Sequence, residues 1–149
     1  MEQQLVVFEL AGESYGINIA AVESIIKMQA ITQLPQFKPY LRGMINLRGA
    51  VLPVIDLRIR FGLEANEASR NARIIIVSIG TLKLGMVVDE VSEVLLIQDE
   101  NIDALPPTVV SANSGFLKGI VRIDQRLVTL LELARVLDLD EQAQLAAVR

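Results

Sequence analysis

Short apolar segments follow one another along the chain, most of them roughly four to eight residues long and rich in valine and isoleucine. Such segments are typical of β-strands when turn-forming residues separate them, as at Ala11–Glu13 and Gly80–Thr81. The close spacing favours an all-β barrel or sandwich over a parallel α/β sheet. Strands are predicted at Leu5–Leu10, Ser14–Ile19, Val22–Met28, Met44–Leu47, Val51–Leu57, Arg73–Ile79, Leu82–Val88, Val91–Ile97, Leu117–Ile123 and Arg126–Leu131.

Three parts of the chain break this rhythm. The polar segment Gly62–Arg70 is the best candidate for a linker, and Asp99–Ser114 is expected to form a long loop around Pro106 and Pro107. The last residues carry leucine and alanine at helical spacing with an interruption at Asp138. This pattern predicts one or two short helices, a C-terminal helical segment at about 132–148.

The chain contains an internal repeat. The segment Tyr15–Glu23 is matched 69 residues later by Leu84–Ser92, and Leu41–Leu57 is matched 76 residues later by Leu117–Leu133. In the second alignment, leucine, a basic residue and glycine recur in order, and an acid followed by leucine recurs further on. The change in spacing places about seven additional residues in the second copy, in the loop around Pro106.

We therefore predict two homologous subdomains, at about 15–66 with the terminal segments and at about 71–133. Each is close to the lower size limit for independent folding, so the two should share a hydrophobic core or a tight interface. A groove between two such units is a natural binding site.

The repeat raises a question about Arg48, which sits with Gly49 at the tip of a predicted strand pair. Gly49 suits a turn because glycine tolerates positive φ. The equivalent tip in the second copy carries Asp124 and Gln125, so a turn of this kind does not require arginine. Arg48 therefore needs a separate explanation, as an ion-pair anchor or as part of a recognition surface.

The composition removes several classes of chemistry. The 149 residues include no histidine and no cysteine, so the commonest general base and any thiolate nucleophile or cysteine-based zinc site are missing. A net charge of −4 with only four phenylalanines and two tyrosines disfavours nucleic-acid binding. No apolar run approaches the roughly 18 residues that span a bilayer, and no signal peptide is evident. We expect a cytoplasmic protein without metal, cofactor or membrane insertion.

Motifs for enzymatic chemistry are weak. Gly80–Gly85 has the glycine spacing of a phosphate loop but lacks the following lysine and the strand-to-helix context. Asp99–Asp103 lacks the central glycine and the ligand spacing of a calcium loop. Asp89 and Glu90 could form a catalytic carboxylate pair, although adjacent acids at a turn are far commoner. A small carboxylate-dependent hydrolase is thus a remote alternative.

Charge is distributed unevenly along the chain. This pattern is compatible with ordinary solvated faces, or with a basic side and an acidic side suited to oriented assembly. In a first, basic region, Gln36–Arg60, one acid (Asp56) accompanies five basic residues: Lys38, Arg42, Arg48, Arg58 and Arg60. A second, acidic region, Leu84–Leu117, has no lysine or arginine and contains Asp89, Glu90, Glu93, Asp99, Glu100 and Asp103.

Three segments carry a family resemblance: YGINIAAVESI from Tyr15, YLRGMINLRGAVLPVIDLR from Tyr40 and LGMVVDEVSEVL from Leu84. They resemble the signature segments of the CheW family of bacterial chemotaxis coupling proteins, and the similarity extends from Leu5 to about Leu139. The resemblance implies two five-stranded SH3-like β-barrels that share a hydrophobic core. It also implies a non-enzymatic adaptor associated with membrane receptor arrays. Its partners would be the cytoplasmic tip of methyl-accepting chemoreceptors, the regulatory domain of the histidine kinase CheA, and other CheW copies in rings.

The same resemblance assigns candidate binding residues. The receptor tip is a helical hairpin, which would bind through Ile19, Val22, Ile25, Arg48 and Val91, and the kinase-facing patch would include Ile31 and Val51. Core packing is the alternative role for the apolar positions, since the spacing of three is compatible with one side of a helical turn. Members commonly carry an acid at the position of Ser24, so an internal partner for Arg48 is in doubt here. A CheW-like adaptor of a non-flagellar system, such as type IV pilus motility, is a further alternative.

Overall fold

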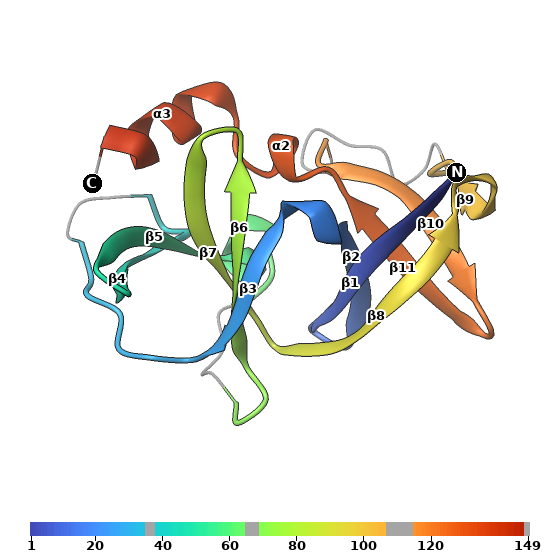
Figure 1. Cartoon of the computed structure of the whole chain (residues 1–149), viewed down its shortest axis with the longest axis horizontal. Helices are drawn as coiled ribbons and strands as arrows, with labels where there is room; N and C mark the ends of the chain where they lie inside the picture. Colours follow the sequence, from blue (N-terminus) through green and yellow to red (C-terminus); the bar gives the residue numbers. More distant parts are fainter. Residues whose placement is uncertain (35–37, 65–68, 107–114, 148–149) are drawn as a thin grey trace.

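The computed structural model describes residues 1–34, 38–64, 69–106 and 115–147, and the fold is almost entirely β. Short helical turns connect some strands, and two helices close the chain (Figure 1). The strands are β1 Glu2–Leu10, β2 Glu13–Asn18, β3 Val22–Lys27, β4 Leu41–Leu47, β5 Ala50–Asp56, β6 Arg73–Ile79, β7 Leu82–Val88, β8 Glu90–Gln98, β9 Ile102–Asp103, β10 Leu117–Ile123 and β11 Arg126–Leu131. The helical elements are η1 Ile19–Ala21, α1 Leu57–Arg60, η2 Asp99–Asn101, α2 Leu133–Val136 and α3 Leu139–Ala147.

The strands form two sheets that lie side by side (Figure 1). One has the order β8-β1-β2-β11-β10-β9 and the other the order β3-β6-β7-β5-β4. The short strand β9 has a counterpart in the second sheet, the isolated bridge between Thr32 and Met44. The predicted all-β class with two SH3-like subdomains is confirmed. Parts of the predicted linker and of the long loop, residues 65–68 and 107–114, lie outside the described residues.

Each sheet contains strands from both halves of the sequence. The β1–β2 hairpin of the first repeat lies between β8 and β11 of the second, and the β6–β7 hairpin of the second repeat lies between β3 and β5 of the first. Both insertions are completed by a parallel pair, β2 with β11 and β7 with β5. The predicted units at about 15–66 and 71–133 therefore describe the duplication in sequence, and the two sheets divide the chain differently in space. The inserted hairpins therefore join strands of both repeats within each sheet, and the chain passes between the two sheets from β2 to β3 and from β7 to β8.

Equivalent residues make equivalent contacts in the two sheets. A methyl group added at Gly16 would lie 3.4 Å from Leu5, and one added at Gly85 would lie 2.6 Å from Ile74, the repeat equivalent of Leu5. Both positions allow a close approach between neighbouring strands. This contact explains why glycine falls on glycine in the sequence alignment.

The recurring basic and acidic residues of the repeat also have a structural role. Arg42 lies 3.7 Å from the carboxylate of Asp56, and their equivalents Lys118 and Glu132 lie 3.9 Å apart. In both copies the pair joins the beginning of one hairpin strand to the end of the other. Because Asp56 is buried, its partner compensates part of the cost of removing a carboxylate from water.

The largest apolar cluster lies between the two sheets and includes Phe8, Ile55, Ile75 and Leu131. Two smaller clusters fill the two sheets individually. The predicted shared core is thus present, and it contains residues from both halves of the chain.

The C-terminal segment closes this core from one side (Figure 1). The side chain of Arg60 in α1 donates from Nε to the carbonyl of Val136 in α2, at 2.6 Å, and approaches Glu141 of α3 at 3.4 Å. Asp138 and Glu141 exchange side-chain-to-backbone hydrogen bonds at 2.7 and 2.9 Å, a capping box that fixes the start of α3. Leu145 is fully buried, so α3 is anchored at both ends. The helical segment predicted at about 132–148 is formed by α2 and α3, and residue 148 lies outside the described residues.

Candidate functional site

The edge strands β3 and β8 present apolar side chains on the side of the sheets that faces the shared core. Each is the outer strand of its sheet, and each is paired only with the inserted hairpin of the other repeat. A β-bulge interrupts both strands at the same repeat position, between Val22 and Ser24 in β3 and opposite Val7 and Phe8 in β8. A bulge adds one residue to a strand and re-aims the side chains that follow.

The bulge explains the three-residue spacing of the candidate residues. Without it, Val22 and Ile25 would point to opposite faces of β3, because side chains alternate along a strand. With it, Val22 pairs with Val77 and Ile25 with Ile75, and both partners belong to the shared core. The helical turn suggested by the spacing is therefore wrong for these two residues, which lie on a bulged strand.

We call the surface formed by Ile19, Val22, Ile25, Val91, Val94 and Leu96 the edge-strand surface. Ile19, Val22 and Val91 are half-buried and pack against the shared core. Ile25 and Val94 are repeat equivalents, 40% and 50% exposed, and Leu96 is 61% exposed. Four of the five predicted receptor-binding residues lie on this surface, and the fifth, Arg48, lies at the tip of the β4–β5 hairpin. Val94 and Leu96 were not among the predicted residues, although the 69-residue offset of the repeat places Val94 on Ile25.

Arg48 occupies the tip of the β4–β5 hairpin and is exposed. Its φ is +53° and that of Gly49 is +87°, so both residues of this two-residue turn are left-handed. Asp124 at the equivalent tip has φ +55°. Within the described part of the chain, no ion pair involves Arg48. Glu23 is paired with Lys83 at 3.2 Å.

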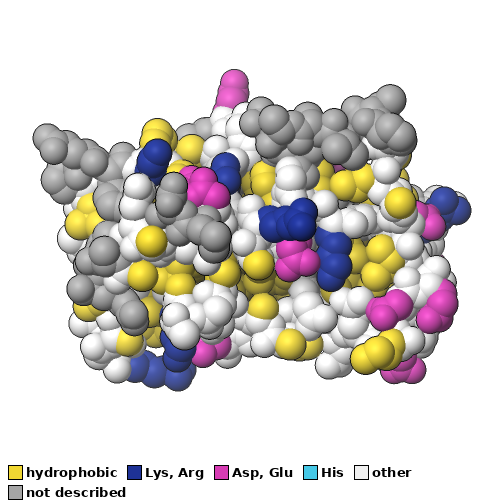
Figure 2. Space-filling model, turned by 90° about the horizontal axis from the view of Figure 1, so that it is seen from above, with side chains coloured by type: hydrophobic (Ala, Val, Ile, Leu, Met, Phe, Trp, Pro, Cys, Tyr) yellow, Lys and Arg dark blue, Asp and Glu magenta, His cyan; other side chains and the backbone are white. Residues whose placement is uncertain are grey.

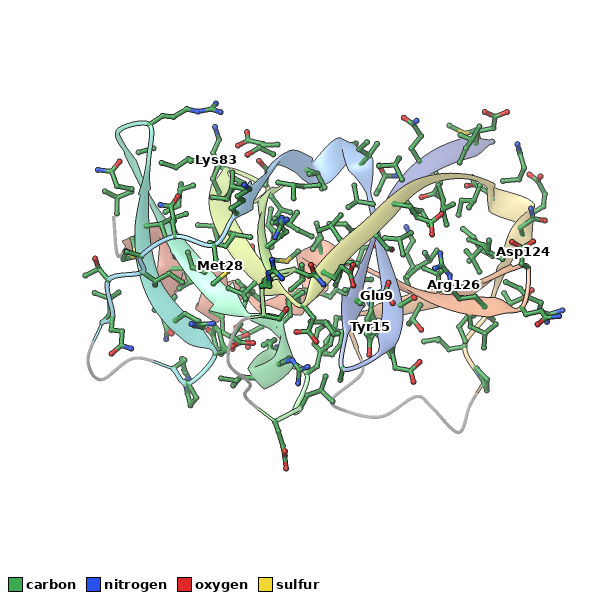
Figure 3. All side chains as sticks on the ribbon, turned by 90° about the horizontal axis from the view of Figure 1, so that it is seen from below. Glu9, Tyr15, Met28, Lys83, Asp124 and Arg126 are labelled. Atoms are coloured by element: carbon green, nitrogen blue, oxygen red, sulfur yellow. The ribbon has the colours of Figure 1, made fainter. Side chains whose placement is uncertain are left out.

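The two predicted kinase-facing residues have different environments. Ile31 is half-buried and packs against the cluster inside the second sheet, so much of its surface is used by the fold. Val51 lies next to the Arg48 tip and is 45% exposed. Its repeat equivalent Leu127 is 55% exposed near the Asp124 tip, at the opposite end of the molecule (Figure 3). The 76-residue offset of the repeat places Leu127 on Val51.

Many of the charged side chains in these two regions form ion pairs within the chain. Of the five basic residues in the first region, Arg42, Arg58 and Arg60 bind carboxylates within the chain. In the acidic region, Glu93 pairs with Arg126. Acidic side chains nevertheless gather at the end of the molecule that carries β9 (Figure 2). The basic segment is therefore not a continuous free basic face.

Asp89 is used as a structural carboxylate. Its two oxygens accept hydrogen bonds from Nε and Nη2 of Arg58 at 2.8 and 2.5 Å, and the backbone N–H of Ala11 donates to it at 2.9 Å. Hydrogen bonding from Arg58 lowers the pKa of Asp89 against the opposing effect of partial burial. The arrangement joins α1, the β1–β2 turn and the start of β8. It gives Asp89 no role as a general acid at neutral pH.

A cavity of about 90 Å³ opens between β1, β2 and β11. It is small, and its lining combines strand residues such as Leu5 and Leu130 with Asn18, Lys118 and Glu132. In the described ranges, no helix is long and apolar enough to cross a bilayer. Across the same residues there is no group of three or more acidic side chains that could hold a metal ion.

Comparison with known proteins gives consistent matches over nearly the whole chain. The model of the CheW-like domain family matches residues 4–141. The chain is 36% identical over 136 residues to chemotaxis protein CheW of Bacillus subtilis, covering 91% of this chain and 87% of the relative. It is 31% identical over 141 residues to chemotaxis protein CheW of Klebsiella aerogenes, covering 95% and 85%. The crystal structure of the scaffolding protein TtCheW from Thermoanaerobacter tengcongensis matches with a TM-score of 0.85 and 38% identity, over 95% of this chain and 96% of that chain.

Proposed function

The chain belongs to the CheW-like family, and from this premise we propose that it is a non-enzymatic chemotaxis adaptor. It couples the cytoplasmic tips of chemoreceptors to the histidine kinase CheA in cytoplasmic arrays on the membrane. The observation that carries the proposal is the edge-strand surface, where the partly exposed side chains of Ile25 and Val94 lie beside the shared core. An amphipathic helix can bury its apolar stripe on such a surface.

The receptor-binding part of the proposal is supported by burial and shape. Exposed Ile25 and Val94 would lose their remaining water contact beneath a helix, which is the main source of favourable free energy in such interfaces. Arg48 is exposed at the tip of the β4–β5 hairpin, and we propose it as a contact to a neighbouring protein at that tip.

The kinase-binding part of the proposal rests on Val51, which offers an exposed apolar side chain next to Arg48. Ile31 would contribute only through its remaining exposed surface. Leu127 provides an equivalent apolar position at the other end, so an adaptor of this kind could contact a neighbour at each end, including other copies in a ring.

The proposed mechanism requires no chemistry. The adaptor presents separate surfaces in a fixed relative geometry, and a change of receptor state shifts the populations of kinase states through those contacts. The exchanged hairpins suit this role because each edge strand is paired with a hairpin of the other repeat.

Co-sedimentation with a receptor tip fragment and CheA, together with kinase activity, tests the proposal. Ile25→Asp should weaken receptor binding by about tenfold or more, because the helix would cover a carboxylate in place of an apolar side chain and remove it from water. Val51→Asp should preserve receptor binding and reduce kinase binding. Thr81→Asp, at the exposed β6–β7 turn, is the matched control and should change neither. Full receptor binding and kinase activation by a folded Ile25→Asp variant would contradict the proposal.

A further inference from the structure

The edge-strand surface has approximate two-fold symmetry. Val22 and Ile25 on β3 are the repeat equivalents of Val91 and Val94 on β8, and the bulges coincide. Both strands begin near the middle of the molecule; β8 runs toward the end that carries β9, and β3 runs along the other sheet beside β6 (Figure 1). A surface with this symmetry offers a helix almost the same contacts in two opposite orientations. A signalling interface requires one orientation, so the residues that break the symmetry become important.

The symmetry is broken at the outer end of each strand. Two residues beyond Ile25, on the same face of β3, is Lys27, which is exposed. The equivalent position on β8, two residues beyond Val94, is Leu96, which is 61% exposed. One end of the surface therefore continues as apolar, and the other ends in a cation.

The cationic end contains two like charges. Lys27 lies directly opposite Arg73 in the β3–β6 ladder, and like charges in this position destabilise a sheet. The guanidinium of Arg73 donates to the carbonyls of Arg70 and Ala72, and within the described residues neither Lys27 nor Arg73 has an ion pair. An incoming carboxylate would relieve this repulsion.

The apolar end has the opposite electrostatic character. Beyond Leu96, the turn η2 carries Asp99 and Glu100. Asp99 accepts a hydrogen bond from Gln3, and Glu100 lies 3.4 Å from the N-terminal amine with 71% of its side chain exposed. A partner carboxylate placed here would meet like charge, whereas an apolar side chain could cover Leu96.

We propose that Lys27 and Leu96 fix the direction in which a partner helix lies on the edge-strand surface. The helix places an acidic residue at the Lys27–Arg73 end and an apolar residue over Leu96. This inference rests on the proposed function, because the partner is the helical tip of a chemoreceptor, and it adds the orientation and the residues that select it. The reverse orientation leaves Lys27 against an apolar side chain and a carboxylate near η2.

Site-specific cross-linking tests the orientation directly, and the absence of cysteine in the chain makes every introduced thiol unique. Gln29→Cys marks the Lys27 end, and Gln4→Cys marks the other end because Gln4 is exposed and pairs with Leu96. The probe is a purified receptor tip fragment with one cysteine at either the more acidic or the more apolar end of its binding helix. Bismaleimide cross-links then report which ends meet.

We expect Gln29→Cys to cross-link to the acidic end and Gln4→Cys to the apolar end, each with a preference of about two- to fivefold, the range of one exposed ion pair. Exchanging the two residues, with Lys27→Leu and Leu96→Lys together, should reverse the preference. Lys27→Leu alone should bring the two yields close to equality. Thermal unfolding verifies that each variant is folded, as expected for exposed positions.

The outcomes separate this inference from the proposed function. If Gln29→Cys and Gln4→Cys, with Lys27 and Leu96 unchanged, each cross-link equally to both ends of the receptor helix, the proposed orientation is wrong although receptor binding stands. A preference that persists unchanged after the exchange would also overturn the orientation. Failure of the tip fragment to bind at all would remove the proposed function and this inference with it.

Discussion

Arg48 is in a backbone conformation that arginine disfavours, which allows its structural and binding roles to be separated by one substitution. Its φ of +53° and the +87° of Gly49 define a turn for which asparagine followed by glycine is strongly preferred. A non-glycine residue in the left-handed region costs roughly 1 kcal/mol, and asparagine avoids much of this cost by local hydrogen bonding. Arg48→Asn should therefore stabilise the fold by about 0.5–1 kcal/mol.

The rest of the turn supports this estimate because it does not depend on the guanidinium. The side chain of Asn46 accepts a hydrogen bond from the backbone N–H of Gly49 at 3.0 Å. For a chain of this length, 1 kcal/mol corresponds to about 2–4 °C in Tm. Thermal unfolding of Arg48→Asn should therefore show a Tm raised by about 1–4 °C, and urea unfolding should show a higher midpoint concentration.

Binding to CheA and to neighbouring copies supplies the second measurement. If Arg48 contacts a neighbour, Arg48→Asn should be more stable and yet bind more weakly. Asp124→Asn is the control, because Asp124 has the same φ and aspartate already tolerates it. A lower Tm for Arg48→Asn would show that the arginine braces the fold from within. A stable variant with undiminished binding would reduce Arg48 to a turn residue.

Three further substitutions test the architecture. Asp89→Asn should make the free energy of unfolding less dependent on pH in acid. The pKa of Asp89 is below its ordinary value of 3.8, so its contribution to stability is present above about pH 4 and is lost as the pH falls through the folded-state pKa. If urea unfolding shows the same pH dependence below about pH 4 for the variant and the wild type, this reasoning is wrong. Gly85→Ala should cost about 1–3 kcal/mol because the new methyl group would lie 2.6 Å from Ile74, and Gly16→Ala, with a nearest contact of 3.2 Å, should cost less; the reverse order in thermal unfolding would be incompatible with the packing. Leu145→Ala should cost about 2–4 kcal/mol and make α3 more sensitive to limited proteolysis, and native-like resistance would show that α3 is anchored mainly by its polar contacts.

Much of the local structure could be predicted from the sequence because the signals are local. The strands Arg73–Ile79, Leu82–Val88, Leu117–Ile123 and Arg126–Leu131 have the bounds that were expected. Turn-forming residues and alternating burial define such strands within a few residues of chain. The internal repeat also followed from the sequence, because the glycines and the ion pair of each copy are needed for its own packing.

The features that escaped prediction depend on distant parts of the chain. Nothing local in β1 and β2 indicates that they lie between β8 and β11, since antiparallel hairpins would equally pair within their own repeat. The bulges in β3 and β8 are seen only in the cross-strand register, and they decide that Val22 and Ile25 share a face. The positive φ of Arg48 was likewise not predicted, because the adjacent Gly49 already accounted for a turn with positive φ.

The exchanged hairpins have a mechanical consequence for an adaptor. If each repeat formed its own sheet, the two could move against each other at their interface, as small domains usually do. Here β3 is paired with β6 of the other repeat and β8 with β1, so moving the two repeats apart would break a strand ladder in each sheet. Such an opening would also expose the shared core, whose largest members are fully buried. Hydrogen-bonded ladders therefore hold the two repeats together within each sheet, and the shared core holds the two sheets against each other, so the edge-strand surface and the two hairpin tips keep their relative positions.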